Sequence, residues 1–177
     1  MTVTSVQTAV FDTFGSLYAG QLAESGSNAL VEGVRNYRTE TVITFGRGVV
    51  KGTVNAQNDP LLTPFGVKTP LAGSLLADFV GIAVLIQSSS SDANNLAVTV
   101  RTETMIPVAE LGSGAIVGAV VPAGITIAHG DPVYMSVSHA SIPVGAFSNA
   151  ADTGLIAITG ATWYGAAAAG TVGRIKL

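Results

Sequence analysis

Cysteine is absent from this 177-residue chain, and charged side chains are scarce. The lack of cysteine excludes a disulfide framework, a thiolate metal site and a thiol nucleophile. It does not indicate a compartment, because chains without cysteine occur in every redox environment. The chain is nevertheless long enough to bury the core of one domain without disulfides or a metal.

The shortage of charge is the strongest signal in the composition. Asp, Glu, Lys and Arg make up 11% of the sequence, against about 25% in an ordinary soluble domain. A monomer of 17.8 kDa exposes about 8,000 Å², which spreads the 8 basic and 11 acidic residues at about one per 420 Å². Because charged residues are depleted where subunits meet, we expect an oligomer or a component of a larger assembly.

The same composition argues against two classes of partner. A net charge of -3 and a pI near 5.2 do not suit direct nucleic-acid binding, which usually needs a basic face. The most apolar window, residues 111–128, contains Ser113, Pro122, Thr126 and four glycines, and its apolar core is shorter than the ~20 residues of a membrane-spanning helix. No basic region precedes an apolar run at the start, so we expect no secretory signal.

From residue 39 onward the pattern of apolar runs and turn residues is that of an all-β protein. Short apolar runs alternate with clusters of Gly, Pro, Asn, Asp and Ser, a pattern typical of strands and turns. The spacing favours a single compact β-sandwich or barrel-like domain of short antiparallel strands over residues 35–177. The expected strands cover 39–45, 49–54, 79–87, 96–102, 116–121, 125–128, 132–138, 155–161 and 171–177.

Two details of this pattern can be checked directly. In the last strand, alternation places the cations Arg174 and Lys176 on the face opposite Ile175 and Leu177. A short helix within residues 71–80 is the one alternative to strand and loop, although Gly73 weakens it. Long loops are expected at 55–69 and 88–95.

Residues 1–34 differ from the rest because no helical or strand period persists there. Such a segment cannot easily build a core of its own, and is either a mobile terminus or an extended arm laid on a neighbour. The aromatic residues Phe11, Phe14 and Tyr18 favour an N-terminal extended arm, since a merely solvated tail rarely carries them.

Candidate catalytic and metal-binding groups have simpler structural explanations. Gly112-Ser113-Gly114 lacks the spacing and flanks of a phosphate loop or a nucleophile elbow, and indicates a turn between strands. His129, Asp131 and His139 are possible metal ligands, but residues 129–132 are also typical of a tight turn entering a strand. The acids form no preferred pair for acid–base work. We therefore expect no enzyme and no cofactor.

Within residues 35–177, four residues are candidates for contact with another protein. Arg35, Arg38 and Arg47 lie close together in sequence, either as a solvated sheet edge that discourages aggregation or as an arginine-bearing contact surface. Trp163 suits either the core or an interface.

Several motifs together carry a family resemblance. They are the run Ile43-Thr44-Phe45-Gly46-Arg47-Gly48-Val49-Val50, then Phe79-Val80-Gly81-Ile82-Ala83-Val84, then Gly130-Asp131-Pro132-Val133-Tyr134, then Ala161-Thr162-Trp163-Tyr164, and the closing residues 172–177. In order and spacing, residues 35–177 resemble the capsid cement or decoration proteins of tailed bacteriophages.

The resemblance implies a virion protein that is made in the host cytoplasm and binds the outer surface of an icosahedral head after the shell expands. It would bridge neighbouring major capsid proteins, with itself as a second partner in a homotrimer or a dimer. Expected contacts are Phe11, Phe14, Tyr18, Arg35, Arg38, Arg47 and Trp163. A receptor-binding or fibre-head module that uses loop 88–95, and a small β-barrel enzyme, are the alternatives.

Overall fold

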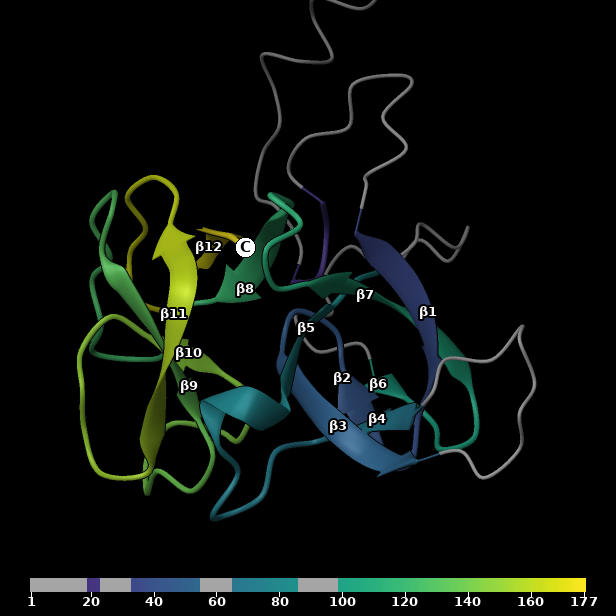
Figure 1. Ribbon diagram of the computed structural model, residues 1–177. Helices are drawn as coiled ribbons and strands as arrows, with labels where there is room; N and C mark the ends of the chain where they lie inside the picture. Colours follow the sequence, from purple (N-terminus) through teal and green to yellow (C-terminus); the bar gives the residue numbers. More distant parts are fainter. Residues whose placement is uncertain (1–18, 23–32, 55–64, 86–98) are drawn as a thin grey trace, which may run out of the picture.

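The computed structural model describes residues 19–22, 33–54, 65–85 and 99–177, and its regular secondary structure consists almost entirely of short antiparallel strands (Figure 1). The strands are β1 (Val34–Arg38), β2 (Ile43–Thr44), β3 (Gly48–Val54), β4 (Phe65–Lys68), β5 (Phe79–Ala83), β6 (Thr99–Val100), β7 (Met105–Glu110), β8 (Ile116–Val120), β9 (Pro132–Ser136), β10 (Phe147–Ser148), β11 (Leu155–Trp163) and β12 (Val172–Lys176). Within those residues the single helix is one 3-10 turn, η1 (Leu76–Asp78).

The strands form two five-stranded sheets and a small two-stranded one. The first sheet has the order β1-β7-β5-β3-β4, the second β10-β9-β11-β12-β8, and β2 pairs with β6. Thr39 forms a bridge with Val67, and the amide of Glu40 donates to the carbonyl of Val67 at 2.9 Å. These contacts join the end of β1 to β4, so the first sheet curls toward closure. The expected all-β, barrel-like fold is confirmed.

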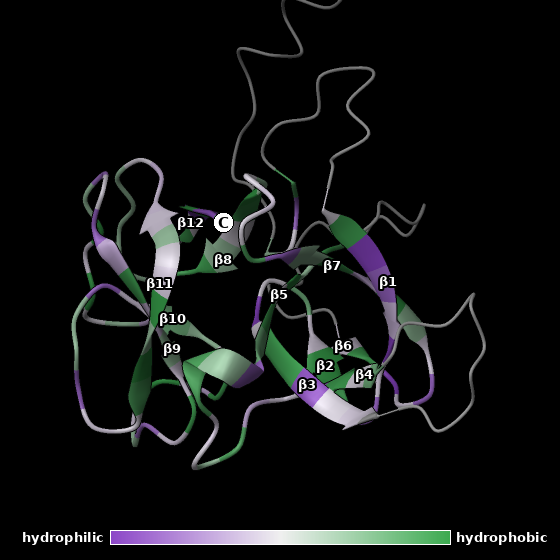
Figure 2. Ribbon diagram, in the orientation of Figure 1, coloured by the Kyte–Doolittle hydropathy of each residue, from purple (hydrophilic) through white to green (hydrophobic). Residues whose placement is uncertain are grey.

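The alternation of side chains along β3 explains how the first sheet contributes to two hydrophobic cores. Val49 and Val50 are both buried but point to opposite faces of the strand. Val49 belongs to a cluster enclosed by the curled first sheet, whereas Val50 belongs to a larger cluster shared with the second sheet. Figure 2 shows hydrophobic residues along β5 and β8 and over the first part of β3. The two sheets are therefore joined by a common core.

Residues 19–22, inside the expected arm, lie between the two sheets of the same chain. Gly20 donates to Gly118 of β8 at 2.7 Å and accepts from Leu85, beyond β5, at 2.9 Å. Gln21 accepts from the amide of Gly118 at 2.8 Å, and Leu22 forms a bridge with Val117. This short segment therefore ties β8 to the region after β5.

Five of the expected strands are confirmed within two residues at each end: 49–54, 116–121, 132–138, 155–161 and 171–177. In the last of them Arg174 and Lys176 are exposed while Ile175 and Leu177 are buried, as alternation predicts.

Other expectations were wrong in extent or position. Within 39–45 only β2 is a strand, because the chain turns at Thr39 after β1. Residues 125–128 form no strand beyond an isolated bridge from Ile127 to Ala167, β5 stops at Ala83, and of 96–102 only β6 is a strand among the described positions.

Four strands were not expected. β1 lies at the expected boundary between arm and domain, and β4 lies in the expected loop 55–69. β7 contains Pro107, and β10 has only two residues. The possible helix shrinks to η1, since Phe79 and Val80 enter the buried strand β5.

Candidate functional surface

Two of the three candidate arginines lie on β1, a strand that pairs with β7 along one edge. Arg35 and Arg38 are exposed, and alternation along the strand directs them to opposite faces. The third, Arg47, lies in the turn between β2 and β3. The structure therefore brings Arg35 and Arg38 to one edge of the first sheet and separates Arg47 from them.

Both β1 arginines already face a carboxylate of their own chain. Arg35 Nε lies 3.6 Å from Glu110 Oε1, and Arg38 is paired with Glu103. The Arg35 side chain is 68% exposed, and an exposed ion pair of this kind contributes about 0.2–1 kcal/mol. An incoming carboxylate can therefore replace either partner at little cost.

Glu110 is held in place from the interior. The hydroxyl of Tyr37, a buried residue of β1, donates to Glu110 Oε1. Burial of the phenol, followed by this hydrogen bond and the negative charge of Glu110, raises the pKa of Tyr37 well above its usual value. Tyr37 therefore stays neutral and fixes the carboxylate beside Arg35.

Arg47 has a different environment, facing the loop that precedes β10. Its Nη1 donates to the carbonyl of Val144 at 2.9 Å, and next to it the amide of Gly48 donates to the carbonyl of Gly145 at 2.8 Å. Burial lowers the pKa of the Arg47 guanidinium from its usual value. Part of this side chain thus joins the β2–β3 turn to the second sheet.

The remaining candidate contacts divide into buried and undescribed residues. Trp163 has no exposed surface, packs in the shared core and donates from its indole nitrogen to the carbonyl of Ser148 at 3.3 Å. Of its two possible roles, the structure therefore supports the core. Phe11, Phe14 and Tyr18 lie outside the described residues, as does the loop 88–95 of the fibre-head alternative.

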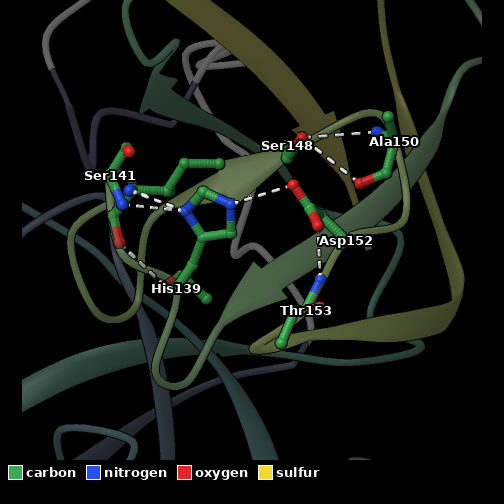
Figure 3. A network of polar contacts seen from close by, with 8 residues as sticks. His139, Ser141, Ser148, Ala150, Asp152 and Thr153 are labelled. Atoms are coloured by element: carbon green, nitrogen blue, oxygen red, sulfur yellow. Dashed lines mark hydrogen bonds and ion pairs between the residues drawn. The ribbon is translucent and has the colours of Figure 1, made fainter.

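His139 anchors a loop of the second sheet through hydrogen bonds at both ring nitrogens (Figure 3). Its Nδ1 accepts the amides of Ser141 at 3.1 Å and Ile142 at 3.0 Å, which leaves the ring hydrogen on Nε2, 3.2 Å from Asp152 Oδ2. The amide of Thr153, followed by His139, lowers the pKa of Asp152. Both ring nitrogens are thus taken by two amides and a carboxylate.

The other histidine and its neighbouring acid form the expected turn before β9. Asp131 Oδ2 accepts the amide of Ala128 at 2.8 Å and the side chain of Asn149 at 2.7 Å, and these bonds lower its pKa in that order. His129 Nδ1 accepts the amide of Gly165 at 3.0 Å. Across the described ranges, no three His, Cys, Asp or Glu side chains gather closely enough to hold a metal ion.

The sequence profile of one protein family covers nearly the whole chain. The profile described as structural cement protein (E217 gp24/Pam3 gp6) matches residues 6–177. The chain belongs to the structural cement protein family. It is therefore a structural virion protein that stabilises a phage capsid, and the family indicates a structural role in place of catalysis.

The fold of this cement protein also occurs in a solved virus particle. A chain in the capsid of Myoviridae phage XM1 superposes with a TM-score of 0.63 at 15% sequence identity, covering 97% of this chain and 96% of that one. At this identity the likeness concerns the fold alone. A search among curated proteins gave no significant match. No helix in the described part of this cement protein has the length and hydropathy to cross a membrane.

Proposed function

We propose that this cement protein binds the outer surface of the expanded head and bridges neighbouring major capsid proteins. Family membership carries the association with the capsid, and the shortage of charge supports extensive contact with other subunits. A subunit that binds the assembled shell, and not separated capsid proteins, shifts the equilibrium toward the shell by mass action.

Two regions supply the contacts in this proposal. The β1 edge offers Arg35 and Arg38, whose exposed ion pairs can be exchanged for carboxylates of a capsid protein. Phe11, Phe14 and Tyr18 in residues 1–18 act as an arm on a neighbouring subunit. A homotrimer engaging several sites gains further from effective concentration, so individually weak contacts suffice.

Co-sedimentation separates bridging from simple binding. The purified protein is mixed either with expanded heads that lack it or with unassembled major capsid protein. Bridging predicts binding to heads at a Kd at least about tenfold lower than to unassembled subunits, which corresponds to about 1.4 kcal/mol. Equal affinity for both forms contradicts bridging, and no affinity for heads contradicts the function as a whole.

The β1 edge is tested in the same assay with a charge-matched control. We expect the double variant Arg35→Ala and Arg38→Ala to bind heads more weakly than the wild type. A control with Arg174→Ala and Lys176→Ala removes two exposed cations from β12 instead. Equal binding by the two double variants would show that the β1 edge is not a specific contact.

A further inference from the structure

Exposed leucines gather in the segment that links β4 to β5. Leu71 and Leu75 are 61% and 64% exposed, and Leu76 is 36% exposed. This segment descends from β4, runs below the junction of the two large sheets and returns through η1 (Figure 1). Half of the large apolar side chains exposed in the described ranges thus belong to one short connection.

Local hydrogen bonds hold this segment in an ordered shape. The amide of Leu71 donates to Ser74 Oγ at 3.0 Å, and the amide of Ser74 donates back to the carbonyl of Leu71 at 2.9 Å. The amide of Leu75 donates to Asp78 Oδ2 at 2.9 Å. These hydrogen bonds satisfy the backbone amides of the segment in this conformation. The leucines therefore stay at the surface and do not pack into the core.

The start of this segment is hydrogen-bonded to the chain just before β2. Thr69 Oγ1 donates to the carbonyl of Val42 at 2.9 Å, and the amide of Thr69 donates to Thr41 Oγ1 at 2.8 Å. Val42 is itself 58% exposed. Thr69 thus brings the start of the linking segment next to the exposed Val42, and the exposed Leu71 follows two residues later.

A small cavity opens beside the contact between Thr69 and Val42, and the turn between β2 and β3 forms part of its wall. Its volume is about 150 Å³, and its lining includes Val42, Thr44, Arg47, Thr69 and Val144. A cavity of about 150 Å³ holds a molecule the size of benzene, which is space for the end of one side chain.

Two cations border this surface, while the nearby carboxylate of Asp78 already accepts the amide of Leu75. In the part of the chain that the structure describes, Arg47 faces a carbonyl and no carboxylate, unlike Arg35 and Arg38. Lys51 adds a second cation, since its Nζ donates to the carbonyl of Ala77 at 3.0 Å next to Leu76. A guanidinium that donates one hydrogen bond to a carbonyl keeps donors for a carboxylate.

We infer that Val42, the cavity beside Arg47 and the leucines of residues 71–76 form a docking surface for an acidic, apolar-flanked segment of the major capsid protein. An Asp or Glu side chain enters the cavity toward Arg47, and its apolar neighbours cover Leu71 and Leu75. This inference rests on the proposed function and identifies a contact that the β1 edge does not supply.

Two kinds of variant test the surface in the full-length protein. Val42→Asp places a negative charge at the cavity mouth and removes no hydrogen bond within the chain, so it repels an incoming carboxylate. The double variant Leu71→Ser and Leu75→Ser removes the apolar part. Ala169→Asp, at an exposed position between β11 and β12, is the charge-matched control.

Binding to heads that lack the cement protein is measured by co-sedimentation, and the oligomeric state by analytical ultracentrifugation. We expect the Val42 variant and the double leucine variant to raise the Kd about tenfold or more, and the Ala169 variant to stay within about twofold. Wild-type affinity in both test variants overturns the inference, and so does an equal loss in the control.

Two further outcomes are distinguished by the same data. If Val42→Asp changes the oligomeric state but not head binding, the surface joins copies of this chain, and the inference is wrong. If the wild-type protein itself does not bind heads, the proposed function is wrong, and the inference, which rests on it, is wrong as well. The double leucine variant keeps the test valid should Val42→Asp fail to fold.

Discussion

Gly20 offers a sharp test of whether residues 19–22 belong to the folded domain. Its φ is +82°, and a Cβ built there would lie 2.8 Å from Phe45 Cβ, 2.9 Å from the amide nitrogen of Gly46 and 3.0 Å from the carbonyl oxygen of Ala83. Gly112 is the matched control, because its φ is +84° and a Cβ there meets nothing within 4 Å.

Gly20→Ala and Gly112→Ala share the left-handed backbone strain, which costs about 1–2 kcal/mol for an L residue. Only the Gly20 variant adds overpacking against three neighbours, for a further ~1–3 kcal/mol. At about 2–4 °C per kcal/mol for a chain of this size, the Gly20 variant should melt about 2–12 °C below the Gly112 variant.

Thermal unfolding of both variants, followed by circular dichroism at one protein concentration, measures this difference. A fixed concentration is required because self-association shifts the apparent Tm. Equal melting temperatures would show that residues 19–22 do not stabilise the contact between the two sheets. These residues would then belong to the N-terminal arm and not to the folded domain.

The remaining predictions concern the arm, the core and the acid side of the pH profile. Removing residues 1–18 should leave the Tm nearly unchanged but weaken binding to heads, and unchanged head binding would disprove the arm. Trp163→Ala should cost about 3–5 kcal/mol in urea unfolding, whereas Tyr164→Ala, at a partly exposed position, should cost far less; similar losses would mean that Trp163 is not a core residue. The lowered pKa of Asp152 gives a contribution to stability that is present above its unfolded pKa and is lost as the pH falls through its folded pKa. The free energy of unfolding of Asp152→Asn should therefore fall less than that of the wild type between pH 5 and 2, as about pH 4 is the unfolded midpoint. An identical pH profile would contradict the lowering of the Asp152 pKa by the amide of Thr153 and by His139.

Local patterns predicted the second sheet better than the first. In β8, β9, β11 and β12 the apolar runs are bounded by Gly, Pro and Asp, so the strand limits follow from turn chemistry. Turn residues also explain His129 and Asp131 without a metal. The alternation of Arg174 with Ile175 is a local property, which is why it was predictable.

The first sheet depends on pairing between distant segments. β1 carries few apolar residues and is a strand because Tyr37 is buried opposite Ile106 of β7. β7 was not predicted as a strand because it contains Pro107, and proline usually indicates an edge strand or a break in a strand. No local signal in the sequence indicates that Leu22 forms a β-bridge with Val117, which is far away along the chain.

Closeness in sequence does not show how the candidate arginines are arranged in space. Arg38 and Arg47 are nine positions apart, yet the turn at Thr39 and the β2–β3 turn put them in different surroundings. The exposure of Leu71 and Leu75 was not predicted, because the spacing of the apolar residues in 71–80 is compatible with a short helix. Exposure of these leucines follows from hydrogen bonds to Ser74 and Asp78, which only the folded chain shows.

DNA release on heating tests capsid stabilisation most directly. Heads packaged without this protein are compared with the same heads after the purified protein is added back, and the DNA that becomes accessible to a dye is recorded against temperature. Stabilisation predicts that heads without it release DNA at a lower temperature and that adding it back restores the wild-type profile. Superimposable release curves with and without the bound protein would contradict the central claim.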